Sequence, residues 1–351
     1  MAYKQLDILF GAAETGLTGG PMDLSLTATA GFPPASITAI AANFLQVADG
    51  FSLDIQNEMT AQKFATGFFD QHASIPGTIS AEAKITTYLQ SGGKNGGDPN
   101  TPDSFGKYLS ACGLKCTLGT GTPTFYVPSS DYADDWNPMT LWKYTGDTTS
   151  SGSNLYQANG VLFNGVLKGE IGKPFQLDLT GKGAVNALPY VATYPAGPFT
   201  QLSDLNPAVM KASPITLLGA FYRALSFEFD FGNKVELIKD MTATYGFVRA
   251  DITDRASKWK LKIYEAATVD GGESSNLYSA MQAQSSFDIS FYFALTTGYG
   301  ITIATGTNTT APMASNAAQL TKIVPGNENG VNTWELEGII IGNNWSLQTS
   351  V

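Results

Sequence analysis

Apolar and polar residues alternate with a period of two in several segments of this chain. In the segment 225–231 every second residue is leucine or phenylalanine, and Ser226, Glu228 and Asp230 lie between them. Because successive side chains of a strand point to opposite faces, this pattern predicts a strand with one buried face. The same alternation occurs in the segments 175–180, 258–263, 287–293 and 334–337. We therefore expect a mainly β protein.

The strand pattern also repeats after 176 residues. The segment 51–59 (FSLDIQNEM) aligns with 227–235 (FEFDFGNKV), and both keep Asp at the fourth position and Asn at the seventh. The same offset aligns 85–88 (ITTY) with 261–264 (LKIY). An internal duplication of about half of the 351 residues predicts two tandem domains, 1–184 and 185–351. A Gly-, Pro- and Ala-rich connector is expected at about 180–214.

One short helix is expected in each copy. In the segment 104–112 apolar residues recur at intervals of three and four, and Gly113 follows as a stop signal. The segment 275–284 has the same spacing. Both predicted helices follow glycine-rich stretches, so the order of strands, turn, helix and strand recurs in the two halves.

The composition narrows the possible functions. Charged residues make up only 14% of the chain, 37 residues are glycine, and the net charge is −10. No lysine and arginine cluster is interleaved with aromatic residues, which argues against tight binding of nucleic acid. The first residues lack the pattern of a signal peptide, and the longest uncharged stretch, 24–47, contains Pro33-Pro34 and is a poor membrane span. We expect no membrane association and a protein that is soluble in the cytoplasm when it is made.

Neither a metal nor a cofactor is expected. The only two cysteines, Cys112 and Cys116, are four residues apart, and His72 is the only histidine. A structural zinc site needs four such ligands. The cysteines are therefore expected to be small core residues on one face of a helix end.

Taken in order, these segments resemble the tail tube (major tail) proteins of long-tailed bacteriophages. The strand 51–59 is followed by 75–80 (IPGTIS), the strand ending at Tyr88, the helix, 122–129 (TPTFYVPS), 141–144 (LWKY), and 164–169 (NGVLKG) before the closing strand 175–181 (FQLDLTG). The second copy has 252–255 (ITDR), a strand ending at Tyr264, the helix, and 326–330 (GNENG) before 333–338 (TWELEG). It departs from the first in lacking the IPGT element and in a longer segment before the closing strand.

The resemblance implies two tandem copies of a tail-tube β-sandwich or barrel domain, each with one short flanking helix. In that family, strands from neighbouring subunits close a wide barrel around a lumen, and chains with two fused domains form trimers with pseudo-sixfold symmetry. It further implies rings that stack around a tape-measure protein, with tail-terminator and distal tail proteins as further partners, and a place in the virion tail after assembly in the host cytoplasm. DNA would pass through the lumen without specific binding. The fused pair of domains favours a non-contractile, siphovirus-type tail.

Seven acidic residues stand on the polar side of alternating strands. We hypothesise that several line the lumen, where negative charge repels DNA phosphates. They are Asp54, Asp178, Glu228, Asp230, Asp288, Glu335 and Glu337. Lys258, Lys260 and Lys262 have the opposite sign, so their strand is expected to face another subunit or the outside. The polar segments 144–154 and 305–316 and the chain ends, 1–47 and 343–351, are candidates for contacts between rings.

No enzyme is expected. His72 has no suitable nucleophile near it, and the chain contains no Gly-x-Ser-x-Gly and no Walker loop. Asp134-Asp135 beside Trp136 is a weak sign of a sugar site. Asp251 and Asp254 beside Arg255 are expected to form a surface salt-bridge turn. Two alternatives stay open: a tail-terminator or baseplate protein that forms a single ring, and a monomeric carbohydrate-binding β-sandwich adhesin module with an exposed aromatic platform.

Overall fold

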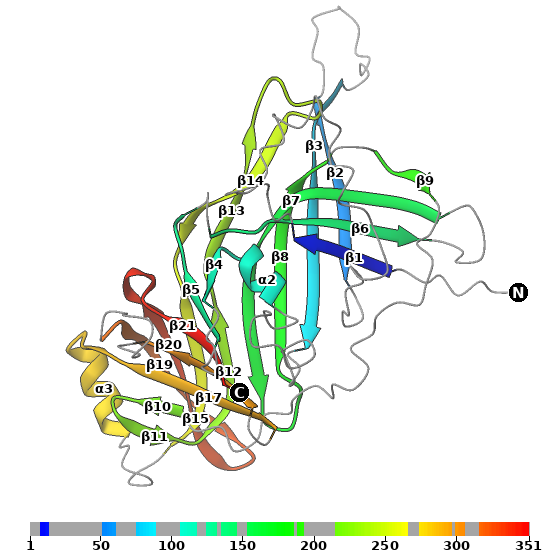
Figure 1. Ribbon diagram of the computed structural model, residues 1–351. Coiled ribbons are helices and arrows are strands. Elements are labelled where there is room, and N and C mark those ends of the chain that lie inside the picture. The colour runs from blue at the N-terminus through cyan, green and yellow to red at the C-terminus, as the bar shows by residue number, and fades with distance from the viewer. Residues whose placement is uncertain are drawn as a thin grey trace, which may run out of the picture.

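The computed structural model describes residues 8–13, 51–60, 75–88, 106–117, 124–131, 135–145, 153–185, 188–192, 215–265, 274–296, 299–305 and 316–350. These residues form a mainly β structure of antiparallel sheets with two short α-helices, as Figure 1 shows. The predicted mainly β class is therefore confirmed.

The strands of the first half are β1 (Ile8–Ala13), β2 (Ser52–Thr60), β3 (Ile75–Tyr88), β4 (Leu114–Thr117), β5 (Thr124–Pro128), β6 (Met139–Thr145), β7 (Ser153–Glu170) and β8 (Gln176–Ala184). Those of the second half are β9 (Tyr190–Ala192), β10 (Ile215–Leu217), β11 (Ala220–Tyr222), β12 (Ala224–Asp230), β13 (Asn233–Lys239), β14 (Phe247–Arg255), β15 (Lys258–Tyr264), β16 (Ser286–Phe287), β17 (Ile289–Thr296), β18 (Tyr299–Ala304), β19 (Ala318–Glu328), β20 (Val331–Ile340) and β21 (Ser346–Ser350). The helices are α2 (Gly106–Ala111) and α3 (Ser274–Gln282), with a 3-10 turn, η3, at Ile341–Asn343.

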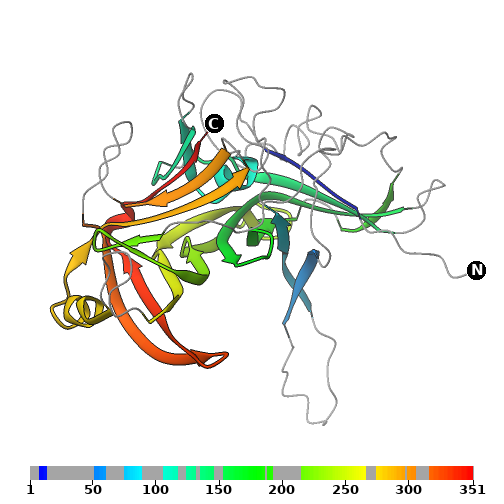
Figure 2. The ribbon, with the colours of Figure 1, turned by 90° about the horizontal axis from the view of Figure 1, so that it is seen from below.

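Most of these strands belong to two sheets that draw on both halves of the chain. The larger sheet has the order β16-β19-β20-β15-β12-β7-β8-β3-β2, and β1, β6 and β9 extend the N-terminal part of β7. The smaller sheet has the order β11-β10-β17-β18-β21-β5-β4. The β13–β14 hairpin leaves both sheets and rises toward the top of Figure 1. The β19–β20 hairpin forms a curved arm at the lower left of Figure 2.

The apolar faces of the two sheets pack against each other and form one core. The ring of Phe227 on β12 lies 4.7 Å from that of Phe291 and 5.0 Å from that of Phe293 on β17. Phe175, just before β8, lies 4.6 Å from Phe293. Apart from the partly buried Leu225, the apolar residues of the alternating segments are buried as predicted, since side chains of period two fill the space between the sheets.

The internal duplication is visible in the register of the strands. The pairs of β2 with β3 recur 176 residues later, and a bulge occurs at the same point in both copies. Leu53–Ala83, Asp54–Glu82 and Asn57–Ile79 correspond to Phe229–Trp259, Asp230–Lys258 and Asn233–Arg255. The closing strands β8 and β20 are also equivalent. Leu179 of β8 pairs with Ile85, and Leu336 of β20 pairs with Leu261, which is the residue 176 positions after Ile85. Each copy thus contributes four equivalent strands, β7-β8-β3-β2 and β19-β20-β15-β12.

The two sets of four strands are neighbours in one continuous sheet, joined where β12 pairs with β7. Because the halves also share one core, the division into 1–184 and 185–351 stays a prediction. The copies differ in one respect. The long hairpin of the second copy is interrupted after Asp230, and Gly232 turns the chain into β13 with φ 68°. A Cβ atom at Gly232 would collide with the carbonyl oxygen of Ala256, so the turn requires glycine.

Several local expectations need correction. Both helices lie close to their predicted bounds, but Cys112 and Cys116 do not share a helix face, because Gly113 ends the turn after α2 with φ 72° and Cys116 lies on β4. The predicted connector begins too early, since β8 continues to Ala184. The C-terminal segment is not available for a neighbouring ring, because β21 is an inner strand of the smaller sheet. Most of the segments 1–47, 144–154 and 305–316 lies outside the described residues.

Candidate assembly surface

One face of the larger sheet is polar from β19 to β2, and we call it the polar face. In a sheet, directly paired residues point to the same side. Six of the seven predicted acids lie on this face: Asp54 on β2, Asp178 on β8, Glu228 and Asp230 on β12, and Glu335 and Glu337 on β20. The sequence pattern therefore identified a common face from four separate segments.

The seventh acid, Asp288, lies elsewhere. It stands between β16 and β17, where its carboxylate accepts hydrogen bonds from the Asn316 backbone N–H at 2.7 Å and the Thr305 hydroxyl at 3.2 Å. Burial alternates through Asp288 as predicted, but the strand breaks at this point and its continuation β17 belongs to the smaller sheet. Asp288 fixes a local turn and is not part of the polar face.

Lysines alternate with the acids across the polar face. Lys322, Glu337, Lys260, Glu228 and Lys168 are successive register partners on β19, β20, β15, β12 and β7. The lysine strand therefore shares the face of the acids, and the expectation that it faces another subunit or the outside stays a prediction. β15 lies between two acidic strands, and opposite charges on neighbouring strands attract each other. Sequence alternation places a residue on a face but does not tell which strand lies beside it.

Ion pairs follow this alternation. The Nζ atom of Lys260 lies 3.3 Å from Glu228 Oε1, and that of Lys322 lies 3.3 Å from Glu337 Oε1. Lys168 Nζ lies 2.8 Å from Asp178 Oδ2, and this hydrogen bond raises the pKa of the lysine above its ordinary value, against the opposing effect of burial. The charges of this face are mostly compensated between neighbouring strands, so it is not the strongly negative surface that the acids alone suggested.

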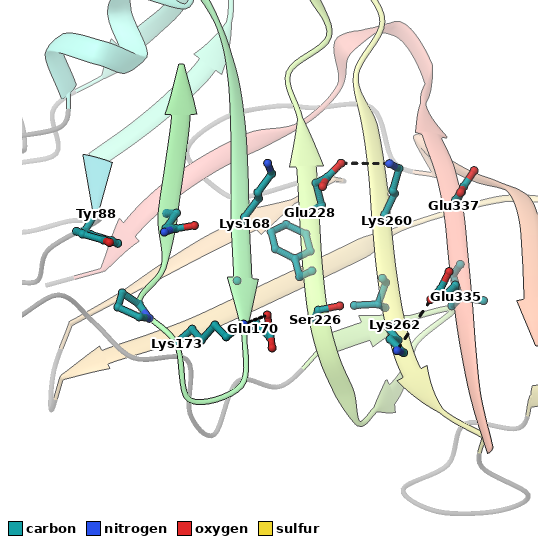
Figure 3. A pocket seen from close by; sticks show the side chains of 16 residues that line it. Tyr88, Lys168, Glu170, Lys173, Ser226, Glu228, Lys260, Lys262, Glu335 and Glu337 are labelled. Carbon is teal, nitrogen blue, oxygen red and sulfur yellow. Dashed lines mark hydrogen bonds and ion pairs between the residues drawn. The ribbon is translucent and has the colours of Figure 1, made fainter. Parts of the chain in front are cut away.

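A hollow of about 640 Å³ lies on the polar face between β8 and β20. Figure 3 shows its charged lining, with the Lys260–Glu228 pair above the Lys262–Glu335 pair. The ammonium of Lys262 also lies 2.7 Å from Glu328 Oε2, and this bond raises the pKa of Lys262. The hollow holds paired charges, so an incoming anion or cation would have to displace a partner that is already present.

The junction between β12 and β7 is held by Asp230 together with two asparagines that the sequence did not single out as functional. Asn164 on β7 donates a hydrogen bond from Nδ2 to Asp230 Oδ1 at 2.8 Å, and its Oδ1 accepts from the Asn233 backbone N–H at 2.8 Å. The buried Asn233 side chain donates to the carbonyl oxygens of Cys112 and Phe163 at 2.7 and 3.0 Å. Asp230 and Asn233 are the polar residues of this segment that are identical in the first copy, as Asp54 and Asn57, and this identity was the available signal.

Arg255 strengthens the same junction. Its Nε donates to Asn233 Oδ1 at 2.6 Å, and its Nη2 donates to the carbonyl oxygens of Cys112 and Gly113, both at 3.1 Å. Burial lowers the pKa of Arg255 to about 10, and the guanidinium stays protonated at neutral pH. The expected surface salt-bridge turn was therefore wrong for this arginine, which points inward and connects the second copy to the end of α2.

The two outer strands of the repeated set, β2 and β19, have open edges in the described part of the chain. Among the described residues β2 pairs only with β3. β19 pairs with β20 on one side and with the two-residue β16 at Ala318 and Gln319 on the other. From Leu320 to Glu328 the second edge of β19 has no strand beside it among the described residues. An open edge presents unpaired backbone N–H and C=O groups that another chain can use.

The described residues contain no cluster of three or more His, Cys, Asp or Glu side chains with the arrangement of a metal site. Within the same ranges, neither α-helix has the length and apolar character that crossing a bilayer requires. No protein-family model matches the sequence, and a search of curated proteins finds no significant match.

Proposed function

We propose that the protein is a structural subunit of a phage tail tube. In this proposal three chains join edge to edge in a ring, and rings stack into a hollow tube that conducts the genome into the host. The observation that supports it best is the internal junction between β12 and β7. Within one chain it joins two equivalent sets of four strands. The two outer strands that keep an open edge, β2 and β19, are the counterparts of the joined strands β12 and β7.

The geometry favours continued head-to-tail pairing. β12 is the second-copy counterpart of β2, and β7 is the first-copy counterpart of β19. A contact that joins two different edges is heterologous, and such contacts close a ring when the rotation between units divides a full turn. Three chains with two sets each supply six similar sets, in agreement with the pseudo-sixfold symmetry implied by the resemblance.

The polar face is the proposed lumen wall. Its lysines and acids neutralise each other across neighbouring strands, so a DNA phosphate meets few cations that lack a partner. Sliding without retention would then result from local compensation of charge and not from general repulsion. The tape-measure, tail-terminator and distal tail proteins, and the location in the virion tail, belong to the same proposal and need no catalytic group on this chain.

Negative-stain electron microscopy and sedimentation of the purified chain test the proposal over a range of protein concentrations. We expect trimers and hollow rings with sixfold features that stack into tubes. Single rings that never stack would instead favour the tail-terminator or baseplate alternative. A monomer at all concentrations, including after addition of tail-tip components as nuclei, would contradict the proposal.

A further inference from the structure

We propose a specific seam between chains, in which β2 of one copy pairs antiparallel with β19 of a second copy. Leu53 lies opposite Pro325, Asp54 opposite Val324, and Ile55 opposite Ile323. Across this seam the carboxylate of Asp54 binds the ammonium of Lys322 of the second copy. The inference rests on the proposed ring and adds its register and its contacts.

The register follows from the junction inside the chain. There Phe229 pairs with Leu167 and Asp230 with Val166, and the Phe231 N–H donates to the Gly165 carbonyl at 2.9 Å. Subtracting 176 converts the β12 residues to Leu53, Asp54 and Ile55. The counterparts of the β7 residues on β19 are found through the closing strands, since β8 corresponds to β20. Leu167 pairs with Leu177 of β8 and Pro325 pairs with the equivalent Trp334 of β20, so Leu167 corresponds to Pro325. In the same way Val166 corresponds to Val324, through Asp178 and Glu335, and Gly165 corresponds to Ile323, through Leu179 and Leu336.

The polar residues that hold the internal junction are present again on the open edge of β2. Asp54 and Asn57 are the counterparts of Asp230 and Asn233, and both are exposed. In the internal junction these side chains bind Asn164 and the carbonyl oxygen of Phe163. The corresponding groups on β19 are Lys322 and the carbonyl oxygen of Leu320. The open edge thus repeats a contact motif that has found its partners elsewhere in the same chain.

Charge makes the proposed contact specific. Asp230 has Lys258 as its neighbour on the adjacent strand, whereas Asp54 has the acidic Glu82 in the equivalent place. Two carboxylates that face each other on a sheet repel, and a cation placed on the outer side relieves this repulsion. Lys322 is the counterpart of Asn164 in the internal junction. β19 therefore offers a positive charge to Asp54, which has no lysine beside it on β3.

Side-chain volumes on the apolar side are also complementary. In the internal junction the smallest residue, Gly165, faces the large ring of Phe231, and a Cβ atom on the glycine would touch that ring. The seam places Ile323 opposite Ile55, two side chains of medium size. Both are partly buried and pack at the margin of the core. The internal junction thus combines a small and a large residue, and the seam combines two isoleucines of intermediate size. The total side-chain volume between the strands is similar in the two contacts.

Pro325 distinguishes the seam from the internal junction. In an antiparallel ladder every second residue directs its N–H and C=O to the same neighbour. The carbonyl of Gly165 accepts a hydrogen bond from β12, so the backbone N–H and C=O of Leu167, two residues on, also point toward β12. The backbone of its counterpart Pro325 therefore points toward the open edge, where proline has no N–H to donate. Proline at an edge discourages indiscriminate pairing. The seam therefore has one fewer ladder hydrogen bond and depends more on the Asp54–Lys322 pair.

Cysteine cross-linking tests the register. Asp54 and Val324 would form a non-hydrogen-bonded antiparallel pair, whose Cα separation of about 4.5 Å suits a disulfide. We expect the double variant D54C/V324C to give covalent dimers and trimers on a non-reducing gel after mild oxidation. The control Q56C/V324C uses the same face two residues out of register and should cross-link at least tenfold less. The single variants account for the native Cys112 and Cys116.

Charge reversal tests the ion pair. Asp54 and Lys322 are exposed, and a surface ion pair such as Lys322–Glu337 contributes at most about 1 kcal/mol, so D54K and K322E should change the melting temperature of the monomer by no more than a few degrees. Each should raise the concentration for half-assembly by about fivefold, and the D54K/K322E double variant should return it to within about twofold of wild type.

The outcomes separate this inference from the proposed function. If wild-type rings form but residues 54 and 324 do not cross-link, or if the double variant fails to recover, the seam is wrong and the ring proposal stands. If no rings form at all, the proposed function fails and the seam fails with it.

Discussion

Replacing Asn233 with alanine should destabilise the chain by about 3 to 4 kcal/mol. The substitution removes two hydrogen bonds to the carbonyl oxygens of Cys112 and Phe163 and one from the Nε of Arg255. Neutral bonds of this kind contribute about 1 kcal/mol each and a bond to a charged group about 1.5 to 3 kcal/mol. Arg255 keeps its bonds to the carbonyl oxygens of Cys112 and Gly113, which limits the loss.

Urea unfolding, followed by tryptophan fluorescence at a concentration where the protein is monomeric, gives the free energy of unfolding of both proteins. The matched control is N57A, which removes the equivalent residue on the exposed strand β2 and should change monomer stability by less than about 0.5 kcal/mol. The reasoning fails if N233A unfolds within 1 kcal/mol of wild type, or if N57A and N233A are equally destabilising. In either case the internal junction would not depend on the shared asparagine.

Three further predictions concern packing, the seam and pH. Gly338→Ala should lower the free energy of unfolding by about 3 kcal/mol in the same urea assay, because its Cβ would collide with the ring of Trp259; an unchanged midpoint would contradict this packing. Pro325→Leu should lower the concentration for half-assembly by about fivefold in sedimentation, because it restores an N–H at the proposed seam; weaker assembly would contradict the register. Because the bond to Asp178 raises the folded pKa of Lys168, its stabilisation is present below the unfolded lysine pKa of about 10.4 and is lost as the pH rises through the folded value. The difference in unfolding free energy between wild type and Lys168→Met, about 0.5 kcal/mol for a half-exposed pair, should therefore disappear as the pH rises beyond the folded pKa of Lys168, and a difference that grows there would refute the pair.

The sequence predicts the strands well where one face is buried and the other polar. The segments around Phe227, Trp259 and Trp334 record this contrast in every second residue, so β12, β15 and β20 were located and their acids were placed on a polar side. The duplication also anticipated that strands of the two halves would be equivalent. The conserved register of β2–β3 and of its second-copy counterpart is the structural form of that repeat.

What the sequence did not predict depends on neighbours that are distant along the chain. Lys260 lies between Glu228 and Glu337 because β15 lies between β12 and β20, and no local pattern contains that order. Arg255 stands beside two acidic residues in sequence but extends to carbonyl oxygens more than 140 residues away at the end of α2. The break after Asp230 depends on how closely Gly232 approaches Ala256, which only the folded hairpin defines.

The internal junction between β12 and β7 also has a consequence for the kinetics and the concentration dependence of assembly. Every separate molecule that joins a ring loses translational and rotational freedom, at a cost of at least about 4 kcal/mol. A ring of three double-copy chains has this loss at two association steps, whereas six single-copy chains would have it at five. The equilibrium amount of ring then rises with the third power of the monomer concentration instead of the sixth. A covalent connection between the two copies thus lowers the threshold at which rings appear and makes that threshold less abrupt.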